Sequence, residues 1–324
     1  MKAITSKAWL MALAAALCAI TASAADVFPI KPIRVVVPFA PGGGTDVLSR
    51  IVAQHLSESL GQQVVIDNKP GAGGALGAEI VVKAPPDGYT LYVASTATAM
   101  MPSLYKNLTF DPIKDFAPVA LIGSSPFVFI VNNGVPVKTL PELIALAKSK
   151  PGTLTYGSAG NGSVNHVGME LFKSMAGVDI LHIPYKGSSA ALTDLLGERL
   201  TMMMDTVVSS MPNVKTNRVR ALAVTSLKRS TLAPELPTVN ELGPAGFEVT
   251  PFYCFVAPVG TPDAVVRRLN AEINKVLALP SVRERYAALG AEPTALSPEE
   301  LGRQLQAEER KWTRVVEQGR IRVD

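Results

Sequence analysis

The fold is decided by one stretch, IRVVVPFAPGGGTD at residues 33–46. Its first part, Ile33 to Pro38, is a β-branched run that predicts a strand. The glycines at 42–44 predict a tight turn, and a helical pattern begins at Thr45. That helix would place Leu48, Ile51, Val52 and Leu56 on one face. A strand that passes through glycines straight into a helix opens a βαβ unit, so the sequence predicts an α/β protein.

The same order of elements recurs around Tyr156 to Ser163, YGSAGNGS. A short strand at 154–157 precedes this glycine turn, and a helix is expected from Ser163 to about residue 175. Further strands are expected at residues 64–66, 89–94, 127–131, 179–183, 200–204, 220–225 and 252–257, and further helices from about 75 to 84 and at 139–150, 188–196, 261–279 and 297–318. Strands that alternate with helices predict two mostly parallel sheets flanked by helices.

The N-terminus has the composition of a secretory signal peptide. Lys2 and Lys7 precede an apolar run from Ala8 to Ile20, and Ala22-Ser23-Ala24 provides a small-x-small cleavage site. The apolar run is shorter than the roughly 20 residues that cross a bilayer. An uncleaved anchor or a cytoplasmic start is the alternative. We therefore predict export through the inner membrane and cleavage after Ala24.

The remaining chain is long enough for two domains, since domains typically hold about 100–200 residues. The tail from residue 251 carries one apolar strand and two helices, and it lacks a sheet of its own. We expect the tail to return and complete the first domain. The predicted division is residues 1–24 as signal peptide, residues 25–126 plus 251–324 as a discontinuous first domain, and residues 127–250 as the second domain.

Composition excludes several classes of protein. The chain holds 31 Lys and Arg against 27 Asp and Glu, and removal of Lys2 and Lys7 leaves a net charge of about +2. Such a balance is unlike the dense basic patch of a nucleic-acid binder. No second apolar segment is long enough to span a membrane. After cleavage only Cys254 remains, so no internal disulfide forms, and this thiol is expected to pack as an apolar residue.

The two glycine-rich turns are the candidate binding elements. Each should present free backbone N–H groups at the positive end of a helix dipole, which makes an anion site without a basic side chain. One turn lies in each predicted domain, so the pair could grip the two ends of a diacid or hold one carboxylate from both sides. A purely structural tight turn is the alternative for each. Neither turn matches G-x-x-x-x-G-K-[ST] or G-x-G-x-x-G, so no nucleotide cofactor is expected.

The sequence gives little support for a catalytic site or a metal site. The chain has no G-x-S-x-G elbow, and His55, His166 and His182 lack an H-E-x-x-H pattern or a cysteine partner. We therefore predict no catalytic residue, no metal and no cofactor. His166 could border the site or sit on a helix face. Asp46 could act as a base, but its place in a first helical turn is better suited to accepting hydrogen bonds from loop N–H groups.

Six motifs follow one another along the chain: VVPFAPGGGTD at 36–46, NKPGAGG at 68–74, PPDGYTL at 85–91, YGSAG at 156–160, IPYKG at 183–187 and RALAVT at 220–225. In order and spacing they resemble the Bug-type receptors of tripartite tricarboxylate transporters. The resemblance covers essentially the whole mature chain. It implies a periplasmic two-domain Venus flytrap that binds carboxylates, partly through water bridges. Dicarboxylates, tricarboxylates, amino acids and aromatic acids are the implied ligand classes.

The resemblance also implies which residues bind the ligand. The loops at 39–46 and 158–163 would be carboxylate pincers, here called the first and second pincer loops. Asp205 looks like the acidic cleft residue of the family, although an aspartate would repel a carboxylate unless it binds an ammonium or a water. The implied ligand-binding residues are Phe39, Ala40, Pro41, Gly42, Gly43, Thr45, Asp46, Ser95, Thr96, Ser158, Gly160, Asn161, Gly162, Ser163, His166, Tyr185 and Asp205. Asn165, Met169 and the stretch 207–210 lie where related chains vary, so they are candidates for tuning selectivity.

We therefore predict a periplasmic solute-binding protein without enzymatic activity. It would capture a small carboxylated solute between its domains by lobe closure and deliver the solute to the membrane permease subunits of a tripartite transporter. We expect a monomer that binds no nucleic acid. One alternative is a periplasmic carboxylate sensor for a signalling partner. The other is an exported hydrolase or isomerase that uses Asp46, Ser163 or His166.

Overall fold

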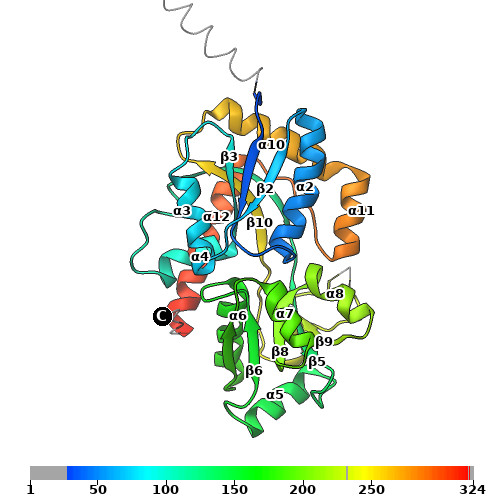
Figure 1. Ribbon diagram of the computed structural model, residues 1–324. Coiled ribbons are helices and arrows are strands. Elements are labelled where there is room, and N and C mark those ends of the chain that lie inside the picture. The colour runs from blue at the N-terminus through cyan, green and yellow to red at the C-terminus, as the bar shows by residue number, and fades with distance from the viewer. Residues whose placement is uncertain (1–27, 231–232, 320, 322–324) are drawn as a thin grey trace, which may run out of the picture.

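The structure, a computed structural model, describes residues 28–230, 233–319 and 321. The chain forms two lobes, each built on a five-stranded sheet with helices packed against it (Figure 1). No helix in the described part of the chain is long and apolar enough to cross a membrane. The signal peptide predicted at residues 1–24 lies outside the described residues.

The sheet of the first lobe has the strand order β2-β1-β3-β10-β4. Its strands are β1 (Ile33–Val37), β2 (Val64–Asn68), β3 (Thr90–Ser95), β4 (Phe116–Ser124) and β10 (Phe252–Pro258). Strand β1 pairs in parallel with β2 and β3, whereas β10 pairs antiparallel with β3 and β4. The strand predicted at residues 33–38 is therefore confirmed, and it lies near the centre of its sheet.

The sheet of the second lobe has the order β7-β6-β8-β5-β9. Its strands are β5 (Phe127–Asn132), β6 (Thr155–Ser158), β7 (Leu181–Pro184), β8 (Met202–Thr206) and β9 (Val219–Val224). Strand β6 pairs in parallel with β7 and β8, and β5 pairs antiparallel with β8 and β9. Both sheets are thus mixed rather than mostly parallel. In each sheet the strand that arrives from the other lobe, β10 or β5, runs against its two neighbours.

The chain passes between the lobes at the end of β4 and again before β10. Ser124 ends β4 and Phe127 begins β5, so the first crossing takes two residues. The second crossing lies between Val224 and Phe252. We propose that the domain limits at residues 127 and 250 follow these two crossings.

The described helices and the one 3-10 turn are α2 (Gly44–Leu60), η1 (Ala72–Gly74), α3 (Ala75–Val82), α4 (Thr96–Leu104), α5 (Leu140–Ser149), α6 (Val164–Ala176), α7 (Ser188–Leu196), α8 (Val207–Lys215), α9 (Val239–Leu242), α10 (Asp263–Ala278), α11 (Pro280–Leu289) and α12 (Pro298–Gly319). The sequence patterns predicted neither the short helices α9 and α11 nor the two helices α4 and α8 at the junction between the lobes. The last two need an explanation. Both are short and contain a proline, Pro102 or Pro212, which argues against a helix on local grounds. Packing at the junction between the lobes outweighs that local preference.

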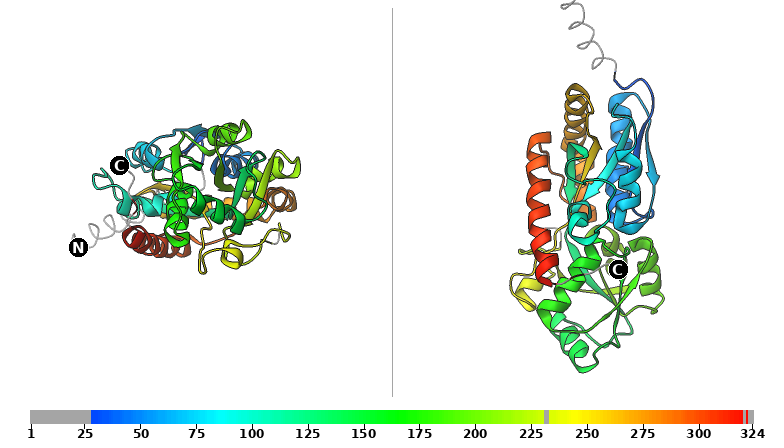
Figure 2. Two further views of the ribbon diagram at one scale, coloured as in Figure 1. Left: turned by 90° about the horizontal axis from the view of Figure 1, so that it is seen from below. Right: turned by 90° about the vertical axis from the view of Figure 1, so that its left-hand side faces the viewer.

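The last helix, α12, contacts both lobes. Leu301 and Leu305 belong to a buried cluster of the first lobe that includes Cys254. Trp312 and Val316 belong instead to the main buried cluster of the second lobe. The tail was expected to complete the first domain. The first half of this helix packs there, whereas its second half packs on the second lobe. Figure 2 shows α12, in red, running along one side of the molecule from one lobe to the other.

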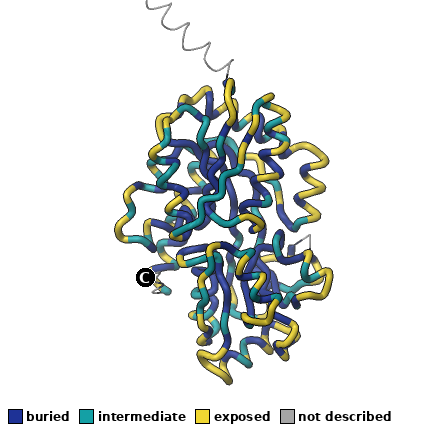
Figure 3. The backbone as a smooth tube through the Cα atoms, viewed as in Figure 1, coloured by how far each residue is buried: buried dark blue, intermediate teal, exposed yellow. Residues whose placement is uncertain are grey.

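The two cores are continuous at the junction. Ala97 and Met100 of α4 pack with residues of the second lobe, and Val208 of α8 packs with residues of the first. Buried residues are accordingly found in both sheets and also in the region where the lobes meet (Figure 3). The structure therefore describes the lobes pressed together, with α4 and α8 forming part of the contact.

Candidate functional site

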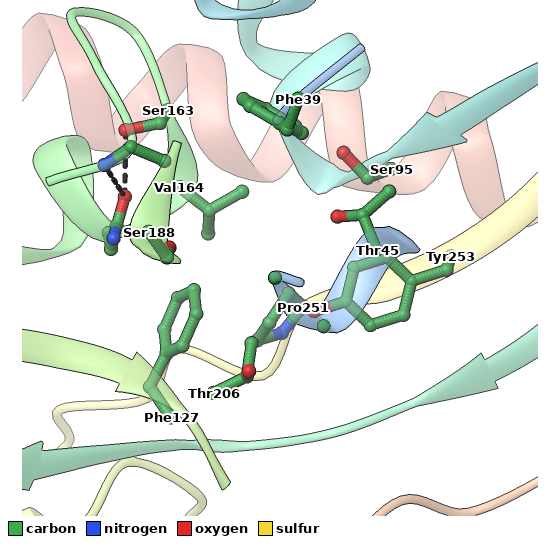
Figure 4. A pocket seen from close by; sticks show the side chains of 14 residues that line it. Phe39, Thr45, Ser95, Phe127, Ser163, Val164, Ser188, Thr206, Pro251 and Tyr253 are labelled. Carbon is green, nitrogen blue, oxygen red and sulfur yellow. Dashed lines mark hydrogen bonds between the residues drawn. The ribbon is translucent and has the colours of Figure 1, made fainter. Parts of the chain in front are cut away.

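A cavity lies where the two lobes meet. The space inside it that the centre of a water molecule can reach is about 40 Å³, so the closed cavity is small. Side chains of residues from both lobes enter it (Figure 4). The lining residues are Phe39, Gly43, Gly44, Thr45, Ser95, Phe127, Ala159, Ser163, Val164, Asn165, Ser188, Thr206, Pro251 and Tyr253.

Five helices begin at this cavity. The N-cap residues of α2, α4, α6 and α8 line it, namely Gly43, Ser95, Ser163 and Thr206. Ser188, the first residue of α7, lines it too. The first turn of each helix has backbone N–H groups without a helical partner, and the helix dipole adds partial positive charge. The cavity is therefore surrounded by positive helix ends.

Two of these five helix ends are capped by their own side chains. Ser95 Oγ accepts from the N–H of Ala97 at 3.2 Å, and Thr206 Oγ1 accepts from the N–H of Ser209 at 3.3 Å. Among the residues that the structure describes, no side chain caps α2, α6 or α7. Their N–H groups stay available to an anion, and no lining side chain is charged. The arrangement suits a carboxylate held by backbone groups and hydroxyls.

The first pincer loop is anchored by a charged side chain. The buried Asp46 accepts hydrogen bonds from the Gly42 N–H at 3.0 Å, from Arg50 Nε at 2.9 Å and from Asn68 Nδ2 at 2.9 Å. Burial acts to raise the pKa of Asp46, but the hydrogen bonds from Arg50, Gly42 and Asn68 outweigh burial and hold its pKa below the ordinary value. The carboxylate thus stays charged and fixes the loop. This agrees with the interpretation of Asp46 as an acceptor of hydrogen bonds from loop N–H groups.

The second pincer loop is anchored by neutral side chains. Ser163 Oγ lies 2.5 Å from the Gly160 carbonyl and 2.7 Å from Asn165 Oδ1, which also accepts from the Ala159 N–H at 3.2 Å. His166 Nδ1 accepts from the Gly162 N–H at 3.1 Å. The Asn165 Nδ2 group is buried and has no hydrogen-bond partner among the described residues. Because Asn165 lines the cavity, this donor is available to a ligand.

A stacked pair of imidazoles lies under the second pincer loop. The rings of His166 and His182 are stacked with centroids 4.2 Å apart, and His182 Nε2 lies 2.6 Å from Ser158 Oγ. Burial lowers the pKa of His166. Burial and the neighbouring His166 together lower the pKa of His182 to about 4. Both histidines are therefore neutral near pH 7, when His166 Nδ1 can accept the loop N–H.

Five predicted site residues meet at the cavity: Phe39, Gly43, Thr45, Ser95 and Ser163. Three more, Gly160, Asn161 and Tyr185, line a wider groove that shares Phe39 with the cavity and therefore adjoins it. Residues of both pincer loops therefore line one cavity between the lobes. The sequence did not distinguish residues on the wall from residues that brace the wall.

The other predicted residues do not line the cavity. Ala40, Pro41 and Gly42 face α7 of the second lobe, where Ser189 Oγ donates to the Pro41 carbonyl at 2.9 Å. The Thr96 hydroxyl accepts from the Phe252 N–H at 3.3 Å. Ser158, Gly162, His166 and Asp46 brace the pincer loops, as described above. Their contribution to binding is therefore indirect.

Asp205 is fully buried behind the cavity. Its Oδ2 accepts from Ser209 Oγ at 2.6 Å, on the first turn of α8. Burial raises the pKa of Asp205, although hydrogen bonds from Ser209, the Thr206 backbone, Ser188 and Ser210 act against burial. The aspartate is absent from the cavity wall, so it makes no direct contact with a ligand there. Its bonds instead fix the start of α8, whose N-cap Thr206 does line the cavity.

Several residues of the cavity wall were not predicted from the sequence. Phe127, Ser188, Pro251 and Tyr253 come from elements that meet only in the folded protein. The Tyr253 hydroxyl is nearly buried and donates no hydrogen bond to a described residue. Ser188 could have been found by its place after Gly187 at the start of a predicted helix, which repeats the pattern of the two pincer loops.

Hydrogen bonds close the cleft at its rim. Tyr105 Oη, in the first lobe, donates to the Asn161 carbonyl of the second pincer loop at 3.0 Å. On the other side, the Ser189 hydroxyl donates to the first pincer loop. A Cβ atom at Gly187 would stand 2.8 Å from Ala40 Cβ, so glycine permits the close approach of these backbones. The cavity is thus the interior of a closed two-lobed clamp.

The profile of one protein family, the tripartite tricarboxylate transporter family receptors, matches residues 48–321. A protein from the tcbD-tcbE intergenic region of Pseudomonas sp. (strain P51) is 42% identical over 91% of this chain and 88% of its own length. Protein BugT of Bordetella pertussis is 37% identical over 90% of each chain. The solved structure of R. palustris Rpa4515 with adipate has a TM-score of 0.88 and 37% identity, covering 91% of this chain and 99% of that one. This chain therefore belongs to the tripartite tricarboxylate transporter family of receptors, which are periplasmic solute-binding proteins rather than enzymes.

Proposed function

We propose that the protein is exported to the periplasm, captures a small carboxylate between its lobes and hands it unchanged to the permease subunits of a tripartite transporter. The observation that carries this proposal is the convergence of the uncapped N-termini of α2, α6 and α7 on one cavity without a charged side chain. Such an environment stabilises an anion through backbone N–H groups. The related protein solved with adipate supports a carboxylate as the ligand class.

The geometry also argues against catalysis at the residues that could have performed it. Asp46 is held by Arg50, Asn68 and the Gly42 N–H, and the Ser163 hydroxyl is directed to Gly160 and Asn165. No hydrogen bond joins Asp46, Ser163 and His166 to one another in the described part of the chain. The contact between Ser158 and His182 is partly buried, and neither residue lines the cavity. A hydrolase would need a nucleophile and base that reach the substrate.

Calorimetry on purified protein freed of bound ligand tests the function, after a thermal-shift screen of carboxylic acids has identified a ligand. Gly43→Val should abolish measurable binding, because Gly43 has an extended backbone with φ −77° and a new side chain would enter the cavity toward Ser188. Ser163→Ala should weaken binding by roughly tenfold, since it loosens the second pincer loop. Both variants should keep the unfolding temperature of the wild type. Unchanged affinity in both would move the site away from these loops, and turnover of the acid would contradict the receptor function.

Export can be tested separately by mass spectrometry of the mature protein. We propose an N-terminus at or near Ala25, because Ala22-Ser23-Ala24 is the cleavage site that the sequence offers. A mature form that retains residues 1–24 in the cytoplasm would contradict the proposed location.

A further inference from the structure

The wall of the cavity has one apolar part. Phe39, Phe127 and Tyr253 enter the cavity from three different sides (Figure 4), and Val164 and Pro251 add aliphatic surface. They come from both lobes, so a ligand enclosed by closure would touch them together. Aromatic side chains around a small cavity favour a flat apolar group, because rings pack by offset stacking or edge-to-face contact.

The positive groups gather at one end of the cavity. A Cβ atom at Gly43, the N-cap of α2, would lie 4.0 Å from Ser188 Cβ at the start of α7. Ser163, the N-cap of α6, lies on the same side of the cavity as Ser188 (Figure 4). Three uncapped helix ends therefore border this side of the cavity. The orphan Asn165 Nδ2 donor belongs to the same helix end as Ser163.

The opposite end of the cavity has hydroxyl groups and no charged side chain. Thr45, in the first turn of α2, and Ser95 lie there, away from Ser163 and Ser188 (Figure 4). Ser95 already caps α4, so that helix end is less available to a second anion. No lining side chain is basic or acidic. A second carboxylate would be desolvated without a counter-charge, and an ammonium group would face helix ends of its own sign.

We propose that the ligand is a monocarboxylate with an uncharged, ring-sized body, that is, an aromatic carboxylic acid. The carboxylate lies against the helix ends of α2, α6 and α7, and the ring lies among Phe39, Phe127 and Tyr253. A hydroxyl on the ring would meet Thr45 and Ser95, which can donate and accept hydrogen bonds. This inference rests on the proposed function, since it names the ligand class of the same cavity, and it separates this chain from its relative that was solved with the dicarboxylate adipate.

Calorimetry with four acids tests the proposal on the purified wild-type protein freed of bound ligand. Benzoate and 4-hydroxybenzoate should bind at least about tenfold more tightly than adipate or glutamate, because only the first two place no second charge in the cavity. Tighter binding of adipate or glutamate, lost again in Gly43→Val, would overturn the ligand class and leave the receptor function standing. If no carboxylic acid binds, both the ligand class and the proposed function are contradicted.

Substitutions of Phe39 test where the ring lies. Phe39→Ala should weaken benzoate binding by about tenfold, since it removes one aromatic wall. Phe39→Arg adds a guanidinium near the neutral part of the wall and should shift the ratio of affinities toward adipate. The exposed Val259→Ala, at 56% exposure, is the matched control and should bind as the wild type does. Unfolding temperatures confirm folding, and wild-type affinity for benzoate in both Phe39 variants would overturn the proposal.

Discussion

The two pincer loops perform the same task with different chemistry. Each follows a strand and leads through glycines into a helix whose N-terminus points at the cavity. The first loop is fixed by an ionised carboxylate, Asp46, in a network with Arg50 and Asn68. The second loop is fixed by neutral groups, His166, Asn165 and Ser163. Backbone geometry is shared, whereas the side chains that impose it are not.

This difference predicts how each loop responds to change. A charged anchor whose pKa lies below the ordinary value holds its loop over a wide range of pH. A neutral imidazole that accepts an N–H holds its loop only while it stays unprotonated. The first loop should therefore be sensitive to loss of charge and to added volume, and the second loop to acid. The following three variants break or sharpen that comparison.

Among the variants that test this comparison, the largest effect is expected at Gly44, where the first pincer loop lies close to the second lobe. A Cβ atom there would stand 2.8 Å from Thr206 Oγ1 and 3.0 Å from Thr206 Cγ2. Gly44→Ala should therefore hold the lobes apart and weaken ligand binding by about a hundredfold, since overpacking typically costs about 1–3 kcal/mol. Calorimetry with the ligand found in the screen measures the effect.

Gly302→Ala in α12 is the matched control for that variant. Its Cβ atom would lie 3.5 Å from Pro118, an ordinary contact, and its site is remote from the cavity. Binding by this variant should equal that of the wild type. If Gly44→Ala also binds normally, the first loop tolerates added volume, and the predicted sensitivity of this loop to added volume is wrong.

A smaller effect is expected from Asp46→Asn. The amide keeps the shape of the side chain but leaves Arg50 without its buried partner and weakens the bond from the Gly42 N–H. Hydrogen bonds to charged groups are worth about 1.5–3 kcal/mol, so the free energy of unfolding should fall by about that amount. Affinity should fall by about tenfold, because the loop remains but is less fixed. Urea denaturation and calorimetry measure the two quantities.

Glu79→Gln provides the comparison for Asp46→Asn. Glu79 forms an ion pair with Lys83 four residues along a helix, as Asp46 does with Arg50, but the Glu79 pair is far more exposed. Exposed pairs contribute little to stability, so this variant should unfold at the urea concentration of the wild type. Equal effects of the two substitutions would show that the anchor of the first loop is no stronger than a surface ion pair.

The sequence was sufficient for the repeated strand-turn-helix units, because local patterns encode them. The helix predicted at residues 188–196 coincides with α7, and both pincer loops lie at the cavity. What the sequence could not reveal depends on contacts between distant segments. Trp312 contacts the second lobe from the end of the chain, and Tyr253 reaches the cavity from the strand that returns to the first lobe. Asp205 was expected at the cleft because of the family resemblance, yet it is fully buried and does not line the cavity.

The smallest effect concerns acid and the second pincer loop. Burial and the neighbouring His166 lower the pKa of His182 to about 4, whereas the pKa of a histidine in an unfolded chain is about 6.5. Between these values the unfolded chain binds a proton that the folded chain does not, so stability falls as pH drops from about 6.5 toward 4 and this contribution changes little below that. Glu170, Lys173 and Tyr156 are the other titratable groups near the stacked pair.

Urea denaturation at pH 7 and pH 5.5, on the wild type and on His182→Gln, isolates this contribution. The wild type should lose about 1 kcal/mol of unfolding free energy from His182 between the two values, since one pKa unit corresponds to about 1.4 kcal/mol. His182→Gln cannot be protonated, so its loss should be smaller by that amount, and any effect of other groups is common to both proteins. Asp46 has its pKa below the ordinary aspartate value and stays ionised over this interval, so the first loop should keep its anchor. Identical losses in the two proteins would mean that the imidazoles do not set the acid sensitivity of the second loop, and the contrast between a charged and a neutral anchor would then have no consequence for pH.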